Sequence, residues 1–206
     1  MTSASAAAEP EPDNGAAALR RWYRAAAMQS QLTRFLLLRG VGFIYVVAFA
    51  ILVAQGLALL GNHGLMPIGS FLRRVADATG SRGAAFWQVP TLFWIDSSDA
   101  MLTVLAWLGL ALGLAVLLGL CNAPILLVLW AVYASFVHAG QTFYGYGWDI
   151  LLLETGFLSV FLAPAWHPWP RPRPLPPLPV IWLFRWLLFR LMLGAGLIKL
   201  RGDSCW

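Results

Sequence analysis

Ionisable side chains stand inside two otherwise apolar stretches near the end of this 206-residue chain. One stretch, residues 148–166, carries two acids, and the next, residues 179–200, carries three bases. These residues are, in chain order, Asp149, Glu154, Arg185, Arg190 and Lys199. An ionisable group at the centre of a membrane helix costs about 2.5–3.5 kcal/mol on insertion scales, so none of them is expected to face lipid. Acids and bases on neighbouring apolar helices either pair with one another or line a polar site.

The depths of these groups predict two ion pairs between antiparallel helices. Counting 1.5 Å per residue, Glu154 lies about 9 Å and Arg190 about 14 Å from the outer edge of the membrane. An arginine side chain spans this difference, and Asp149 and Lys199 likewise fall together near the outer boundary. We therefore expect the pairs Glu154–Arg190 and Asp149–Lys199. Arg185 has no acid at its own depth and is expected to reach inward to the membrane surface.

Two interpretations of these charges stay open at the level of sequence. The pairs either fix only the register and orientation of the two helices, or they belong to a buried acid–base site in a polar cavity. His138 and Gln141 lie one helical turn apart at the end of another apolar stretch. A histidine in that place is typical of an interface residue, and it is also compatible with contact to a proton or a quinone headgroup.

The composition places all these residues in a membrane protein. Hydrophobic residues make up 60% of the chain and charged residues 11%, whereas soluble domains carry about 25% charged residues. The sequence predicts an all-α fold, a polytopic helical bundle of about five transmembrane helices with one interfacial loop helix at 71–80. The expected spans are residues 41–60, 101–120, 123–140, 148–166 and 179–200.

Charge and cysteine content exclude several other classes of protein. The net charge of +5 comes from basic residues scattered at the ends of the apolar stretches. That pattern is typical of membrane orientation and contact with lipid headgroups, and it argues against a nucleic-acid partner. Two cysteines are too few for a disulfide-rich scaffold or a cysteine-built metal site. No cofactor is expected, and membrane lipid is the partner that the composition predicts.

Three parts are expected along the chain. Residues 1–33 mix small residues, prolines and charges and predict a disordered N-terminal tail. Residues 34–200 are expected to form the transmembrane helical domain, whose last span has small residues at 194–196 that would allow close helix packing. Five arginines precede the first span, so we expect a cytosolic N-terminus, with residues 201–206 emerging on the opposite side.

Three segments carry a resemblance to a known family. They are GLMPIGSFL (64–72), YGWDILLLETGFLSVFLAP (146–164) and FRWLLFRLMLGAGLIKLRGDSCW (184–206). Together they resemble the lipase maturation factor family of polytopic membrane proteins, over roughly residues 31–206. The likeness is closer to the member tied to lipase assembly than to the second member of the family.

The resemblance implies a folding factor without catalytic activity in the endoplasmic reticulum membrane, or in the inner membrane of a bacterium. Members of the family help secreted lipases reach their active form, so secretory lipases are the implied clients. In the family a long lumenal domain that engages clients follows the membrane portion. Since the chain stops at Trp206, it is expected to be a fragment lacking the client-binding domain. Cys205 would then emerge on the oxidising side and form a disulfide only with a partner beyond Trp206.

A second function class is an enzyme. The bundle also resembles, more loosely, the membrane halves of vitamin K-dependent carboxylases and small quinone-linked redox proteins. Glu154, Arg190 and His138 would then line a quinone-type pocket. A cavity bordered by these three side chains would favour the enzyme, whereas closed ion pairs in a dry interface would favour the folding factor.

Overall fold

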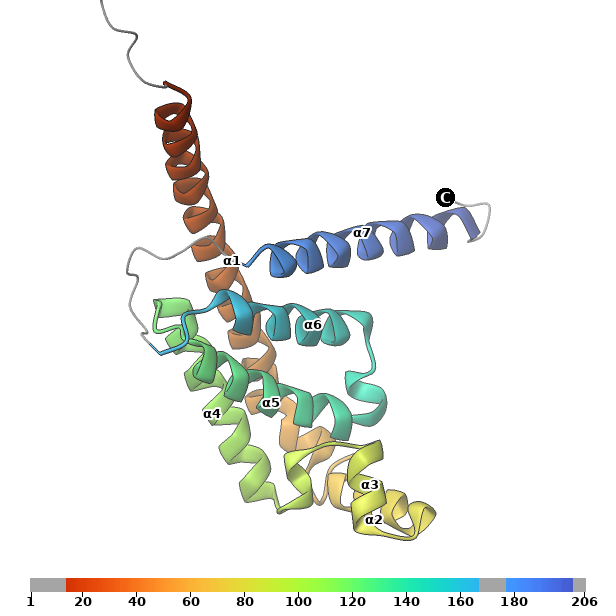
Figure 1. Cartoon of the computed structure of the whole chain (residues 1–206). Helices are drawn as coiled ribbons and strands as arrows, with labels where there is room; N and C mark the ends of the chain where they lie inside the picture. Colours follow the sequence, from red (N-terminus) through yellow and green to blue (C-terminus); the bar gives the residue numbers. More distant parts are fainter. Residues whose placement is uncertain (1–13, 167–176, 202–206) are drawn as a thin grey trace, which may run out of the picture.

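A computed structural model of the chain describes residues 14–166 and 177–201. The secondary structure of these residues is entirely helical (Figure 1), which confirms the predicted all-α class. The elements are, in chain order, α1 (Asn14–Leu60), α2 (Ile68–Thr79), α3 (Arg82–Gln88), the 3-10 helix η1 (Leu92–Trp94), α4 (Asp99–Leu118), α5 (Ala123–Ala139), the 3-10 helix η2 (Gln141–Tyr144), α6 (Gly147–Leu162) and α7 (Leu178–Arg201).

The first helix is much longer than its apolar part. α1 contains 47 residues and begins at Asn14, so residues 14–33 are helical where the sequence predicts a disordered tail. The reason is local: this segment is rich in alanine, arginine, leucine, methionine and glutamine, which are among the best helix formers. Low apolar content therefore did not mean low helix propensity, and the prediction of disorder is corrected there. Residues 1–13 lie outside the described residues.

Among the residues that the structure describes, three helices are long and apolar enough to cross a membrane: Gln31–Leu60 within α1, α4 and α7. The other two predicted spans form shorter helices. α5 has 17 residues and α6 has 16, or about 24–26 Å at 1.5 Å per residue, less than the hydrocarbon thickness of about 30 Å. α5 stops at Gly140, and α6 stops at Ala163, immediately before Pro164. The five predicted segments are thus helical, but two of them are shorter than expected.

The most extensive helix–helix contact joins α1 to α4. Glycines bring the two backbones together. A Cβ added to Gly109 would collide with the ring of Phe49, and one added to Gly113 would lie 3.2 Å from the backbone nitrogen of Val46. On the opposing helix, a Cβ on Gly42 would lie 2.8 Å from the α4 backbone. Gly109 and Gly113 stand four residues apart, which is the small-residue spacing that favours close packing of membrane helices.

Aromatic side chains fill the space between this pair and α5. Tyr45 and Phe49 of α1, with Tyr133 and Phe136 of α5, are all fully buried. The Tyr45 and Tyr133 rings pack edge to face with centroids 5.5 Å apart, and Phe93 of η1 packs the same way on Phe136 at 5.2 Å. Such offset and edge-to-face contacts add specific geometry to the burial of large apolar surfaces. The aromatic cluster therefore fixes α5 and η1 against α1.

The loop between α1 and α4 folds into a crown, which we define as α2, α3 and η1, at the end of the bundle away from the N-terminal end of α1 (Figure 1). The predicted interfacial helix at 71–80 corresponds to α2, which buries Ile68 and Leu72. Thr91 donates from Oγ1 to the carbonyl of Ser135, 3.0 Å away, and the Ser135 hydroxyl accepts from the Leu92 amide at 3.1 Å. These bonds tie the crown to α5.

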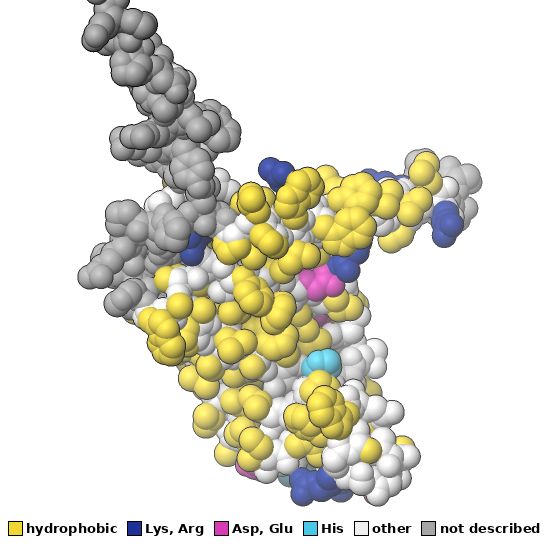
Figure 2. Space-filling model, viewed as in Figure 1, with side chains coloured by type: hydrophobic (Ala, Val, Ile, Leu, Met, Phe, Trp, Pro, Cys, Tyr) yellow, Lys and Arg dark blue, Asp and Glu magenta, His cyan; other side chains and the backbone are white. Residues whose placement is uncertain are grey.

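The last helix lies on the outside of the bundle. α7 packs against α6, and many of its large apolar side chains are exposed (Figures 1 and 2). Gly194 and Gly196 face open space. The small residues at 194–196 therefore make no close contact within the described chain, and the close packing predicted for them is found in the α1–α4 contact instead.

The glycine contact can be tested with a matched pair of substitutions. We expect Gly109→Ala to lower the free energy of unfolding by about 1–3 kcal/mol, because the buried Phe49 ring has no room to move away from the new methyl group. Gly40→Ala, on the same pair of helices but in open space, is expected to be neutral or to stabilise by up to about 1 kcal/mol through helix propensity. Unfolding in mixed detergent micelles, followed by circular dichroism, measures both; equal effects would contradict the proposed packing.

Candidate functional site

Helix α6 carries its two acids toward different sides. Asp149 and Glu154 are five residues apart, which turns them by about 140° around the helix axis. Asp149, in the first turn, is fully buried. The Glu154 side chain is 33% exposed. One acid therefore faces the interior of the bundle and the other faces its surface, so they cannot form one site.

The buried acid is held by a tyrosine of the neighbouring helix. The hydroxyl of Tyr133 donates to Oδ1 of Asp149 over 2.6 Å. Oδ2 of Asp149 and the hydroxyl of Tyr45 are also buried and have no hydrogen-bond partner among the described residues. The N-terminal turn of a helix favours a negative charge, so the position of Asp149 in α6 partly offsets the cost of burying its carboxyl group.

Tyr45 reaches this region because α6 has a glycine opposite it. A Cβ on Gly156 would collide with the Tyr45 hydroxyl. Asp149 and Gly156 are seven residues apart and lie on the same side of α6, within about 20°. Outside the spanning helices, Tyr144 of η2 is buried as well, and burial, followed by the nearby charge of Asp149, raises its pKa to about 12. Tyr144 therefore keeps its proton at any physiological pH.

The acid on the outer side pairs with α7. Glu154 and Arg190 form an ion pair whose side chains are 33% and 54% exposed. Figure 2 shows acidic atoms beside basic ones where α7 meets the bundle. Neither charge would be tolerated singly against hydrocarbon. The pair therefore gives α7 a defined register on α6.

The second predicted ion pair has a different outcome. Asp149 accepts its hydrogen bond from Tyr133 of α5 and is turned into the bundle. Helix geometry explains the difference: Lys199 lies nine residues beyond Arg190, which turns it by about 180° to the far side of α7, while Asp149 is turned by about 140° from Glu154. A comparison of depth alone ignores these rotations. Arg185, expected to reach inward, lies over the Trp182 ring at 5.5 Å.

His138 and Gln141 do not converge on one site. His138 is exposed in the last turn of α5. Gln141 has a positive φ of 52° and donates from Nε2 to the carbonyl of Met66 at 3.4 Å, so it joins η2 to the segment that follows α1. The third residue singled out by sequence, Cys205, lies outside the described residues. Within those residues, no group of three or more His, Cys, Asp or Glu side chains could hold a metal ion.

Sequence reasoning missed the tyrosines. Tyr45 and Tyr133 each stand well inside an apolar stretch, not at a membrane boundary where tyrosine is commonest. A hydroxyl in such a place requires a partner. A search for a partner of the Tyr133 hydroxyl among the nearby polar residues would have predicted its contact with Asp149.

Comparison with known proteins gives a consistent result. A family model described as "Lipase maturation factor transmembrane domain" matches residues 32–206. Lipase maturation factor 1 of Mus musculus is 47% identical over 182 residues, which cover 85% of this chain and 32% of that protein. The Homo sapiens protein of the same name is 43% identical, with the same coverage of both chains.

Lipase maturation factor 2 of Homo sapiens is 40% identical over 189 residues, covering 83% of this chain and 26% of that protein. The chain thus spans about a third or less of the length of these relatives. No solved structure matches it.

The buried hydrogen bond predicts a stability effect. Tyr133→Phe should lower the free energy of unfolding by about 1–2 kcal/mol, because it removes the hydroxyl that donates to a buried carboxyl group. Tyr146→Phe is the matched control, since Tyr146 is 60% exposed in the same region. Unfolding in mixed micelles should separate the two variants, and a Tyr133→Phe protein as stable as Tyr146→Phe would refute the role of the bond.

The outer ion pair predicts a positive coupling energy. Glu154→Arg and Arg190→Glu should each destabilise the protein by placing like charges together, while the double swap recovers about 1–2 kcal/mol of coupling. The combination of Glu154→Arg with Arg185→Glu is the control, because Arg185 contacts Trp182 and not Glu154. A double-mutant cycle on unfolding free energies measures both couplings. A double swap no more stable than either single variant would show that the pair does not hold α7.

Proposed function

The chain belongs to the lipase maturation factor family, and from this premise we propose that it is the membrane-embedded part of a factor that helps secreted lipases to mature. The observation that carries the proposal is the 47% identity to a protein named lipase maturation factor 1 over 85% of this chain. The helical structure supports it, because the matched residues 32–206 include α4, α7 and all but the first residue of Gln31–Leu60, the helices of the described chain that are long and apolar enough to cross a membrane.

The membrane domain is proposed to comprise residues 34–200, with the N-terminal end of α1 in the cytosol. Basic residues support this orientation, since five arginines lie before residue 41, three of them before the start of Gln31–Leu60. Whether α5 and α6 both cross the membrane or both turn back within it, the number of crossings remains odd. The C-terminal end of α7 is therefore proposed to lie on the opposite side, which is the lumen if the membrane is that of the endoplasmic reticulum.

The proposed role is a folding role without catalysis. An enzyme of the quinone or vitamin K type would require a cavity bordered by Glu154, Arg190 and His138. In this structure the carboxylate of Glu154 is engaged by Arg190. The cavity of about 380 Å³ between α2 and η1 is lined by none of the three residues. The ion pair between Glu154 and Arg190 supports a domain that holds and orients the factor in the membrane.

Secretory lipases are the proposed clients. This follows from the names of the relatives. Because the chain spans about a third of those proteins, a test must supply their remaining parts. A chimera does so: the matched segment of the Mus musculus factor is replaced by residues 32–206 of this chain.

We expect this chimera to restore secreted lipase activity in cells that lack lipase maturation factor 1. The reason is that the matched segment has only to insert, fold and position the rest of the factor. Activity of secreted lipase in the medium, normalised to the membrane-inserted chimera, is the measurement. A chimera that also carries Gly40→Ala should restore as much lipase activity as the unsubstituted chimera. A chimera that carries Gly109→Ala should be less stable and should restore less lipase activity. A chimera that inserts as abundantly as the intact mouse protein but yields no active lipase would contradict the proposed function.

A further inference from the structure

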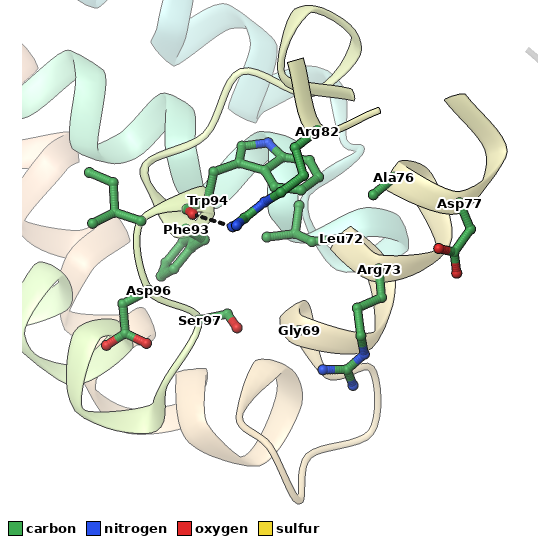
Figure 3. A pocket seen from close by; sticks show the side chains of 11 residues that line it. Gly69, Leu72, Arg73, Ala76, Asp77, Arg82, Phe93, Trp94, Asp96 and Ser97 are labelled. Carbon is green, nitrogen blue, oxygen red and sulfur yellow. Dashed lines mark hydrogen bonds between the residues drawn. The ribbon is translucent and has the colours of Figure 1, made fainter. Parts of the chain in front are cut away.

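A cavity of about 380 Å³ opens within the crown, between α2 and η1 and beside the start of α3 (Figure 3). Its volume falls within the range of about 300–1,000 Å³ that is typical of small-molecule sites. The apolar part of its wall includes Leu72 and Phe93, both buried. Polar and charged side chains from α2, α3 and the segment before α4 complete the wall. The cavity thus combines an apolar base with convergent polar groups.

Three polar side chains on this wall are not used by the protein itself. Arg73, Asp77 and Ser97 form no side-chain hydrogen bond or ion pair within the described part of the chain. Arg73 and Asp77 are four residues apart on α2 but do not pair. The Arg73 side chain instead runs back along the helix toward Gly69 (Figure 3), as the tilt of helical side chains favours. A guanidinium group and a hydroxyl are therefore left available to a ligand.

Gly69 makes the space between these two donors. A Cβ at this position would lie 3.1 Å from Oγ of Ser97 and 3.7 Å from a terminal nitrogen of Arg73. Both donors therefore lie within 4 Å of the same point beside Gly69, so they can approach one ligand together. An oxyanion such as a phosphate, with several acceptor oxygens, matches a hydroxyl and a guanidinium group in that arrangement.

The charges of the cavity are balanced. The other arginine, Arg82, donates to the carbonyl of Trp94 at 3.0 Å and lies 6.0 Å from the Trp94 ring. Asp96 and Asp77 stand at opposite sides of the cavity (Figure 3). Two arginines and two aspartates give a wall of zero formal charge. Such a wall suits a ligand that carries both a negative and a positive group, and it does not favour a purely anionic one.

The position of the cavity indicates where such a ligand comes from. The crown connects the end of α1 to the start of α4, both of which are long enough to cross a membrane. Ile95, which lines the cavity, is 79% exposed, and Trp87 of α3 is 86% exposed. Aromatic and apolar side chains at the ends of spanning helices lie at the level of the lipid headgroups.

We propose that this cavity binds the headgroup of a zwitterionic phospholipid. Its phosphate lies against Arg73 and Ser97 beside Gly69, and its ammonium group lies toward Asp77, because the Asp96 carboxylate already accepts hydrogen bonds from Ser98. The site is independent of the proposed role in lipase maturation. It assigns a ligand to the crown, whereas that role concerns the whole domain.

Lipid retention by the purified full chain tests the site. The chain in detergent is incubated with phosphatidylethanolamine, and native mass spectrometry measures the fraction that carries lipid. Arg73→Gln is expected to reduce the apparent affinity about tenfold, which corresponds to the loss of one charge-assisted contact of about 1.4 kcal/mol. Arg74→Gln is the matched control, because Arg74 is the exposed neighbour that does not line the cavity. Gly69→Ala, which places a methyl group against both donors, is expected to reduce retention as well, at unchanged helix content.

Equal retention by Arg73→Gln and Arg74→Gln would overturn the proposal, and so would unchanged retention in Gly69→Ala. Preferential retention of phosphatidylglycerol over phosphatidylethanolamine would overturn the assignment of a zwitterionic ligand. Soluble phosphoethanolamine distinguishes the sources of the headgroup. If phosphoethanolamine at the same concentration does not displace the lipid, the result supports a membrane lipid as the ligand. If it does displace the lipid, the assignment to a membrane lipid is overturned.

Discussion

The close approach of α1 to α4 is the contact on which the rest of the structure depends. Lipid offers little hydrophobic drive for helices to associate, so the contact between them must come from packing. Gly109 and Gly113 let α4 reach the backbone of α1 on one side. The same helix α1 then presents Tyr45 and Phe49 to α5. Because these aromatic rings are fully buried, the glycine contact indirectly sets the positions of α5 and of η1.

Helix α6 links the α1–α4–α5 core to the outer helix α7, because its two acidic side chains point in different directions. Asp149 turns inward to Tyr133, and Glu154 turns outward to Arg190. Each acid thus restrains one interface of the helix. The inward contact is enclosed and leaves Oδ2 of Asp149 without a partner among the described residues, so its geometry depends on the packing around it. The outward contact is partly exposed, and α7 is held by it and by apolar packing on α6.

The sequence was sufficient to predict which segments are helical, because long uncharged apolar stretches and the amphipathic pattern of α2 are local properties. It was also sufficient to place Glu154 opposite Arg190, since depth along two antiparallel helices follows from residue counts. The contact of Asp149 required the rotation of α6 and the position of Tyr133, which depend on how three helices pack. The helical structure of residues 14–33 was not predicted, because their polar composition was taken to indicate disorder although many of them have high helix propensity. The cavity was missed for another reason: Gly69 and Ser97 meet only once the crown has folded.

Most of the polar contacts gather at the end of the bundle that bears the crown. Gln141 bonds to the carbonyl of Met66, Thr91 bonds to Ser135, and Asp149 lies in the turn of α6 that follows η2. At the opposite end, the connection between α4 and α5 is a short turn closed by Gly119, with φ of 109°, and by the Asn122 cap. A short turn leaves little surface on which groups can converge, whereas the long loop from α1 to α4 has enough residues to enclose a cavity. Loop length thus explains why groups free to bind a ligand lie in the crown, whereas the two acids of α6 are bound by other side chains of the bundle.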